Sequence, residues 1–134
     1  MFKITPINEK ERQAAQCALC SITFKPELFA YEMTDVESGE LMAVAQFEID
    51  GEYGYIADIR PKIGYSDFEA MFILGRATMN FIDLCGAHRC KAAADAGEER
   101  LIKSIGFKKN GDVYECDMTG MFDGNCGGHT VKAD

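Results

Sequence analysis

The chain has 134 residues, of which 47% are hydrophobic and 27% are charged, and its formal net charge is −8. This length and composition predict a single globular domain with a full hydrophobic core. The negative charge argues against nucleic acids and anionic membranes as partners, because both attract basic surfaces, and it suits a basic or neutral substrate. Residues 1–13 lack the apolar segment of a signal peptide, and the longest apolar run, residues 70–74, is too short to cross a membrane. We therefore expect a cytoplasmic protein.

The first predicted elements are a strand and a helix. Residues 2–7 alternate between polar and apolar side chains and include Pro6 near their end, which is typical of a first or edge strand. Asn8, with Glu11 three residues later, resembles a capping box. We therefore expect a helix over residues 9–20.

Three strands are predicted next, over residues 28–36, 41–49 and 55–60. The segments 37–40 and 50–54 between them have the composition of turns. Short connections of this kind join antiparallel neighbours, so we expect an antiparallel meander. One face of the middle strand is expected to carry Leu41, Ala43, Ala45, Phe47 and Ile49.

A long helix is predicted from Ser66 or Asp67 to about Leu84. Its polar side chains fall on one stripe, which indicates that the remaining surface packs flat on the sheet. This stripe comprises Glu69, Arg76, Asn80 and Asp83.

The last predicted elements are a strand, a helix and a hairpin. Residues 88–94 form the strand, and residues 97–105 form the helix, which Gly106 ends as a C′ residue. Residues 107–118 form the hairpin, and residues 119–134 form a tail that contains Gly and Cys. The inward side chains of the strand are expected to be Cys90, Ala92 and Ala94.

This order of elements predicts an α/β fold. A helix connects the fourth and fifth strands, so these two are expected to be parallel neighbours, while the other pairs are mostly antiparallel. We expect a mixed, mostly antiparallel sheet of about six to seven strands, with helices on both faces.

Residues 95–118 resemble the C-terminal half of the GNAT N-acetyltransferases. In that family a strand leads into a helix that ends in a leucine-Gly-Phe signature, and two strands follow; the matching stretch here is residues 104–107. The order of the upstream elements agrees as well, so the resemblance covers residues 2 to about 118. It divides the chain into a GNAT-like domain, residues 1–118, and the tail, residues 119–134.

The resemblance implies an acyl-CoA cofactor, bound in a gap where the fourth and fifth strands diverge. The amides of its pantetheine arm would pair with the backbone of the fourth strand, and its pyrophosphate would lie at the start of the long helix. The cofactor-binding residues implied in this way are Ile59, Arg60, Gly64, Tyr65, Ser66 and Asp95.

The loop before the long helix departs from the family pattern. The family has Arg or Gln, two residues, Gly, one residue, and then Gly or Ala, whereas here Gly64 stands alone. Asp67 and Glu69 follow in the first helical turn, and their carboxylates would repel a pyrophosphate. An alternative interpretation is that Ser66 and Asp67 only cap the helix. Either CoA binds weakly through another geometry, or the fold has lost the cofactor.

The residues for proton transfer also depart from the family pattern. Many GNAT enzymes carry a Tyr five residues before the Phe of the signature, and Ile102 stands at that position here. Others use a carboxylate on the fourth strand as a base, and Asp58, on the face opposite Ala57 and Ile59, is the first candidate. Glu48, near the end of the third strand, is a weaker candidate. Both also fit ordinary solvent-facing strand residues in salt bridges.

The chain has six cysteines, which are expected to be reduced thiols in a cytoplasmic protein. Cys17 and Cys20 are spaced i, i+3 on the first helix, and Cys126 and His129 repeat this spacing in the tail. These four residue types can hold zinc or iron, but the N-terminal pair lacks the local sequence of a zinc ribbon. We predict no metal site and keep one as an alternative.

The other cysteines have simpler interpretations. Cys90 and Cys116 fall on inward strand faces and are expected to be core residues with no disulfide between them. Cys85 lies near His88 at the end of the long helix, but no third residue that would orient such a nucleophile pair is evident.

Three functions remain open from the sequence. The first is a GNAT-like N-acyltransferase, which moves an acyl group such as acetyl from CoA to an amine of a small molecule or peptide, with Asp58 or water as the base. The second is a non-catalytic GNAT-fold binding or regulatory module that has lost CoA. The third is a metal- or redox-responsive protein that uses Cys17, Cys20, Cys126 and His129. The sequence leaves a homodimer open as well.

Overall fold

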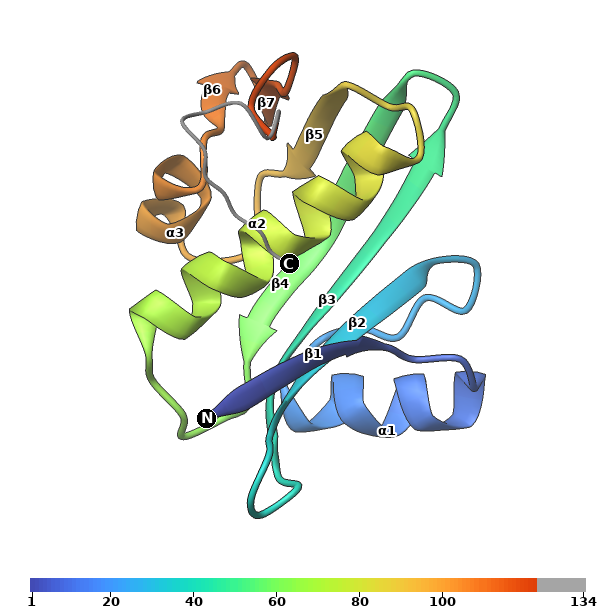
Figure 1. Cartoon of the computed structure of the whole chain (residues 1–134), viewed down its shortest axis with the longest axis vertical. Helices are drawn as coiled ribbons and strands as arrows, with labels where there is room; N and C mark the ends of the chain where they lie inside the picture. Colours follow the sequence, from blue (N-terminus) through green and yellow to red (C-terminus); the bar gives the residue numbers. More distant parts are fainter. Residues whose placement is uncertain (123–134) are drawn as a thin grey trace.

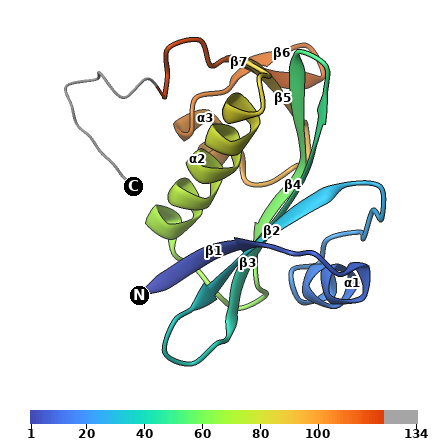
Figure 2. The ribbon, with the colours of Figure 1, turned by 45° about the vertical axis from the view of Figure 1, so that its right-hand side comes forward.

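The computed structural model describes residues 1–122, which form one sheet of seven strands in the order β1-β2-β3-β4-β5-β7-β6. Helix α1 lies on one face of this sheet, and α2 and α3 lie on the other (Figure 1, Figure 2). The elements are β1 (Phe2–Pro6), α1 (Lys10–Leu19), β2 (Phe29–Asp35), β3 (Leu41–Asp50), β4 (Tyr53–Pro61), α2 (Phe68–Leu84), β5 (Arg89–Ala93), α3 (Glu99–Ser104), β6 (Lys108–Asn110) and β7 (Val113–Asp117).

The strand pairing confirms the predicted mixed α/β fold. Strands β4 and β5 are parallel neighbours, and all other pairs in the sheet are antiparallel. The turn predicted over residues 50–54 is shorter than expected, because Asp50 pairs with Tyr53. Gly51 in this turn has a φ of 64°, in the left-handed region that glycine adopts without strain.

The main hydrophobic core lies between the sheet and helices α2 and α3. Helix α2 approaches β4 closely at Gly54, where a Cβ atom would lie 2.3 Å from Cγ2 of Ile82. A larger residue at this position would therefore push the helix away from the strand. Among the buried members of this core are Phe47, Ile56, Ile59, Leu74, Met79, Ile82 and Ile102.

A smaller hydrophobic cluster lies between α1 and the sheet. The prediction that Leu41 shares a face with Ala43 is wrong, because Met33 pairs with Ala43 whereas Thr34 pairs with Leu41. The extra residue, Met42, forms a β-bulge that turns Leu41 toward α1. The buried members of this cluster are Cys17, Cys20, Ile22, Leu41 and Val44.

The two longer helices begin in different ways. Asp67 caps α2 as predicted, since its side chain accepts a hydrogen bond from the backbone N–H of Ala70. In α1 the N-cap position is taken by Glu9, whose side chain makes no capping hydrogen bond. The predicted capping box at Asn8 is therefore wrong.

Two details of the C-terminal half also differ from the prediction. Helix α3 begins at Glu99, later than the predicted residue 97, although Gly106 follows it with a φ of 126° as expected of a C′ glycine. Ala94 lies in the turn after β5 and is exposed, so the inward face of that strand comprises Cys90 and Ala92 alone.

The solvent face of α2 is less polar than predicted. Besides its polar stripe, the helix exposes Ile73, Phe81 and Leu84, and the exposed fraction of Leu84 is 75%.

Among the helices of residues 1–122, none has the length and apolar character that a membrane crossing requires.

Candidate active site: the cleft beside strand β4

Strands β4 and β5 separate halfway along β4, as the sequence predicts. Their pairing runs from Tyr53 only as far as Ile56. The next residue, Ala57, is a β-bulge, because Gln46 of β3 pairs with Asp58 whereas its neighbour Phe47 pairs with Ile56. The second half of β4 therefore forms an edge that β5 does not cover.

A cleft of about 490 Å³ opens along this edge, within the usual size range of small-molecule sites. The end of β4, the loop before α2 and the start of α3 form its walls. Four of the residues implied as cofactor ligands line it, namely Ile59, Arg60, Tyr65 and Ser66.

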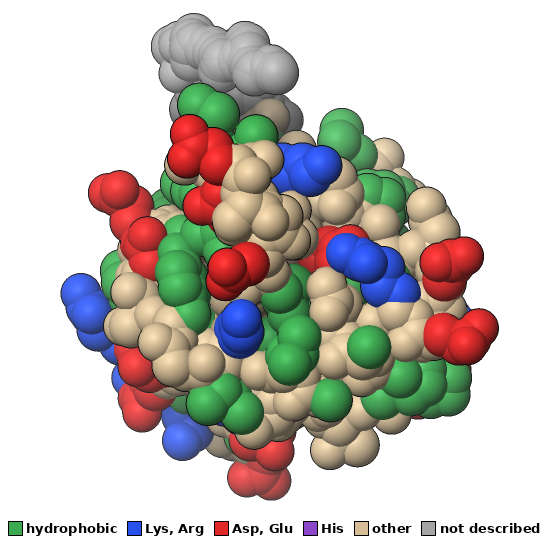
Figure 3. All heavy atoms as spheres, turned by 90° about the horizontal axis from the view of Figure 1, so that it is seen from below, with side chains coloured by type: hydrophobic (Ala, Val, Ile, Leu, Met, Phe, Trp, Pro, Cys, Tyr) green, Lys and Arg blue, Asp and Glu red, His purple; other side chains and the backbone are tan. Residues whose placement is uncertain are grey.

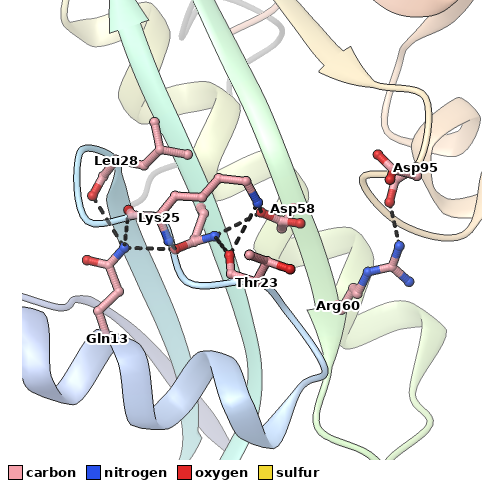
Figure 4. Close-up of polar contacts among 8 residues, drawn as sticks. Gln13, Thr23, Lys25, Leu28, Asp58, Arg60 and Asp95 are labelled. Carbon is pink, nitrogen blue, oxygen red and sulfur yellow. Dashed lines mark hydrogen bonds and ion pairs between the residues drawn. The ribbon is translucent and has the colours of Figure 1, made fainter.

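The other two implied ligands, Gly64 and Asp95, lie beside this cleft. Gly64 turns the preceding loop with a φ of 89°. The backbone carbonyl of Asp95 accepts a hydrogen bond from the guanidinium of Arg60, which reaches across the gap between β4 and the segment after β5 (Figure 4).

The segment after β5 also covers part of the β4 edge. The backbone N–H of Ile59 donates a hydrogen bond of 2.8 Å to the carbonyl of Ala96. At Gly97 a Cβ atom would lie 2.4 Å from the carbonyl oxygen of Ile59, so only glycine allows this approach. The backbone N–H of Ile59 is therefore already paired within the chain.

The start of α2 is occupied by the chain's own carboxylate. Oδ1 of Asp67 lies 3.1 Å from the N–H of Ala70, and the hydroxyl of Tyr65 lies 3.3 Å from Oδ2. Partial burial, together with this nearby carboxylate, raises the pKa of the Tyr65 phenol. Glu69 in the same turn is exposed. The positive end of the helix is thus partly neutralised.

Basic groups enter the cleft from two other elements. Arg60 comes from β4, and Arg100 comes from α3, where its guanidinium carbon lies 3.9 Å from the centre of the Phe68 ring. The sequence analysis missed Arg100 and Phe68, because only the fold brings the start of α3 next to the start of α2. On the molecular face shown in Figure 3, acidic and basic side chains occur among apolar ones.

Asp58 points to the opposite face of β4 and belongs to a buried polar network (Figure 4). Its Oδ2 atom lies 2.8 Å from Nζ of Lys25 and 2.8 Å from Nε2 of Gln46. Gln46 Oε1 accepts hydrogen bonds from Gln13 Nε2 at 2.9 Å and from the N–H of Lys25 at 3.1 Å. Gln46 Nε2 also donates to the carbonyl of Thr23 at 3.0 Å. The alternative interpretation of Asp58 was a solvent-facing residue in a salt bridge. The solvent-facing position is wrong, although a salt bridge, with Lys25, is present.

Glu48, the weaker candidate, is not brought to this network. It is exposed on β3 and pairs with Tyr55 across the sheet, whereas Asp58 pairs with Gln46. Glu48 lines a shallower hollow together with Tyr55 and Lys91. At the position of the family Tyr, Ile102 is fully buried in the core and has no proton to donate.

The cysteines in the described part of the chain are free thiols, as expected. Burial raises the pKa of Cys17 to about 11 and that of Cys20 to about 12. Within residues 1–122, no group of three potential ligands could hold a metal ion. Cys126 and His129, the other half of the alternative metal site, lie outside the described residues.

Near the end of α2, the structure supplies a partner that the sequence analysis missed. His88 Nδ1 lies 2.6 Å from Oδ1 of Asp83. Cys85 is exposed between them in the sequence, but no hydrogen bond joins it to His88 within residues 1–122. The arrangement is a hydrogen-bonded pair of side chains and not an assembled nucleophile.

Comparison with known proteins identifies the fold. No family model and no curated protein sequence matches the chain. Among solved structures, the ribosomal-protein-S18-alanine N-acetyltransferase from Escherichia coli has a TM-score of 0.70 at 12% identity, over 88% of this chain and 94% of that chain. The PaiA N-acetyltransferase from Thermoplasma acidophilum, in complex with coenzyme A, has a TM-score of 0.68 at 10% identity, over 87% and 99%.

A third solved structure agrees with these two. The IAA acetyltransferase from Bacillus cereus has a TM-score of 0.66 at 14% identity, over 86% of this chain and 97% of that chain. The chain therefore has the fold of the GNAT N-acetyltransferases, as a divergent example of it.

Proposed function

We propose that this protein is an acyl-CoA-dependent N-acyltransferase, which transfers an acyl group, such as acetyl, to an amine. The observation that carries the proposal is the cleft along the free half of β4, in a chain with the fold of N-acetyltransferases. Several proteins of this fold are known in complex with coenzyme A. The net charge of −8 favours a basic acceptor, such as a small-molecule or peptide amine.

The pyrophosphate of CoA is best matched by the arginines of the cleft. A guanidinium forms charge-assisted, paired hydrogen bonds with phosphate oxygens, and Arg60 and Arg100 both line the cleft. The start of α2 attracts an anion less than an ordinary helix does, because Asp67 and Glu69 lie there. We therefore assign the phosphate contacts mainly to side chains instead of a glycine loop.

The pantetheine arm has to compete with another segment of the chain for a backbone N–H group of β4. The N–H of Ile59 already donates to the carbonyl of Ala96, so pairing of the arm with β4 requires this carbonyl to move. Breaking one such hydrogen bond costs affinity, and we expect weak binding.

Asp58, next to Ile59 on the strand, is the proton acceptor that we assign to the reaction.

Isothermal titration calorimetry with CoA and acetyl-CoA tests the proposal. We expect measurable binding by the natural protein and about tenfold weaker binding by Arg100→Gln, since a charge-assisted hydrogen bond contributes about 1.5 kcal/mol or more. Arg89→Gln is the matched control, because this arginine is exposed on β5 and does not line the cleft. No binding by the natural protein at millimolar ligand would refute the proposal.

A non-catalytic binding module is the second candidate, and one observation favours it. Both groups that the reaction needs, the N–H of Ile59 and the carboxylate of Asp58, are already paired within the chain. If they stay paired, neither group takes part in acyl transfer, and the Asp58 network serves only stability. Absence of CoA binding both by the natural protein and by Asp67→Asn with Glu69→Gln would support this candidate.

A further inference from the structure

Lys25 holds an amino group next to the carboxylate that we assign as the proton acceptor. It lies in the segment between α1 and β2, which passes over the face of β4 opposite α2 (Figure 4). Its Nζ atom is 2.8 Å from Oδ2 of Asp58 and 3.2 Å from the carbonyl of Thr23. The side chain of Lys25 is 34% exposed and that of Asp58 is 12% exposed. The amine is therefore fixed in place yet still reachable.

One buried glutamine fixes both members of this pair. Nε2 of Gln46 donates to Oδ2 of Asp58 at 2.8 Å, and Oε1 of the same amide accepts from the backbone N–H of Lys25 at 3.1 Å. Gln46 is itself fully buried and bonded to Gln13. A group held by several buried hydrogen bonds keeps its position, as an acceptor in a transfer reaction must.

The pair lies at the point where the sheet opens. Asp58 follows the bulge at Ala57 and is two residues beyond Ile56, where pairing with β5 ends. The next residue, Ile59, lines the cleft that we assign to the acyl donor. Successive residues of a strand point to opposite faces, so cleft and amine lie on the two sides of the same short stretch of backbone. The acyl end of the donor would therefore have to pass the β4 edge beyond Ile56, which β5 does not cover, to reach the amine.

Other lysines have different surroundings. Lys62 lies 3.9 Å from Glu40, whose side chain is 73% exposed, and Lys103 pairs with Glu99, which is 62% exposed. Surface pairs of this kind fix an amine weakly. Among the Lys–carboxylate pairs of residues 1–122, Lys25 is the one whose carboxylate partner is largely buried.

We propose that Lys25 is a site of self-acylation, in which its ε-amino group accepts the acyl group from acyl-CoA. The inference rests on the proposed function, because the donor is the thioester. The ε-ammonium transfers one proton to the Asp58 carboxylate, and the free amine bonds to the acyl carbon. The C–S bond then breaks, and the amide nitrogen loses its second proton as CoA leaves as the thiol. The products are an acylated Lys25 and free CoA, and Asp58 releases the proton that it received to the solvent.

Acylation also changes the charge of the network. The amide at Lys25 is neutral, so the buried carboxylate of Asp58 loses its charged partner and keeps the Gln46 amide. Loss of one partner of a largely buried ion pair destabilises a protein. Without any CoA, Lys25→Gln, which mimics the neutral amide, should therefore unfold at a lower temperature than the natural protein, whereas Lys25→Arg should unfold closer to it.

Mass spectrometry after incubation with acetyl-CoA tests the proposal. Digestion with a glutamate-specific protease avoids cleavage at lysine, and we expect one acetyl group on the peptide that contains Lys25. The initial fraction labelled per unit time should be independent of protein concentration, because donor site and amine belong to one chain. Asp58→Asn should slow labelling about 100-fold, the lower range for loss of a positioned proton acceptor. Lys62→Arg is the matched control and should leave labelling of Lys25 unchanged.

Other outcomes overturn the proposal. Equal labelling of Lys25 and the exposed lysines, or an unchanged rate in Asp58→Asn, would indicate ordinary chemical acylation. If calorimetry shows CoA binding and Lys25 stays unlabelled, self-acylation is refuted while the proposed function stands. If calorimetry shows no binding, the proposed function fails, and self-acylation fails with it.

Discussion

The two sides of β4 use polar residues in opposite ways. On the α1 side, Asp58, Gln46 and Lys25 satisfy one another in a closed network of hydrogen bonds that is largely buried. On the cleft side, Arg100 and Asp67 stand around an open space. Within residues 1–122, the one buried side-chain polar atom without a partner is the hydroxyl of Thr34, which belongs neither to this network nor to the cleft. We infer that changes on the closed side act on stability, and changes on the open side act on binding.

The largest expected effect tests the closed side. Gln46→Leu keeps the approximate volume but leaves the N–H of Lys25 without its partner, removes the shortest hydrogen bond of the Gln13 amide, and removes one donor to Asp58. Each buried polar group left unpaired costs about 1–3 kcal/mol, so we expect the free energy of unfolding to fall by about 3 kcal/mol. Urea denaturation measures this change.

The matched control lies two residues further along the same strand. Glu48→Gln changes an exposed side chain, and its effect should stay within about 0.5 kcal/mol. Similar values for the two variants would show that the network does not stabilise the fold, and the contrast between the two sides of β4 would be lost.

A smaller effect on the closed side comes from its thiols. Burial raises the pKa of Cys17 to about 11 and of Cys20 to about 12, above the ordinary value of 9.0. The unfolded thiols therefore ionise first as the pH rises past about 9, and this favours unfolding. The stabilisation is complete below that pH and is lost as the pH rises toward 11 or 12.

Thiol ionisation should lower the free energy of unfolding by about 1–2 kcal/mol between pH 8 and pH 9.5. Denaturation under reducing conditions measures it, and replacing Cys17 and Cys20 by Ala should reduce the pH dependence by about this amount. The share of Cys90 and Cys116, whose pKa burial also raises, should remain. Cys85→Ala is the control, because Cys85 is exposed. If the double variant keeps the full pH dependence, these thiols are not its source.

The sequence predicts the closed side and the cleft to different extents. Periodicity and turn composition suffice for the antiparallel meander of β2, β3 and β4, and a helix between β4 and β5 suffices for their parallel pairing. The place of β7 between β5 and β6 was not predicted. The bulges at Met42 and Ala57 are not predictable in this way, because one inserted residue leaves the composition of a strand unchanged. Yet the bulge at Ala57 marks where the cleft opens.

The polar network was missed for a related reason. Asp58 is a candidate from the sequence, but the other side chains of the network, Gln13, Lys25 and Gln46, come from a helix, a loop and another strand. No local pattern connects segments so far apart. The cap at Asp67, by contrast, depends on the next three residues alone and is predicted correctly.

The smallest expected effect on stability tests the open side. Asp67→Asn with Glu69→Gln removes two negative charges and keeps a side chain that can cap α2. The free energy of unfolding should change by less than about 0.5 kcal/mol per site. Binding of acetyl-CoA should tighten a few-fold, because the start of the helix regains its attraction for anions, at about 0.3–1 kcal/mol per charge.

The salt dependence of binding separates this explanation from a steric one. In the natural cleft the attraction by Arg60 and Arg100 is opposed by Asp67 and Glu69, so added salt should change the affinity little. In the double variant the repulsion by these two carboxylates is absent, so binding should be tighter and should weaken as salt is added. Equal affinities for the two proteins at every salt concentration would mean that the carboxylates serve only as helix caps. The hydrogen bond from Ile59 to Ala96 would then be the barrier to binding, and it would act by occupying the strand edge and not by charge.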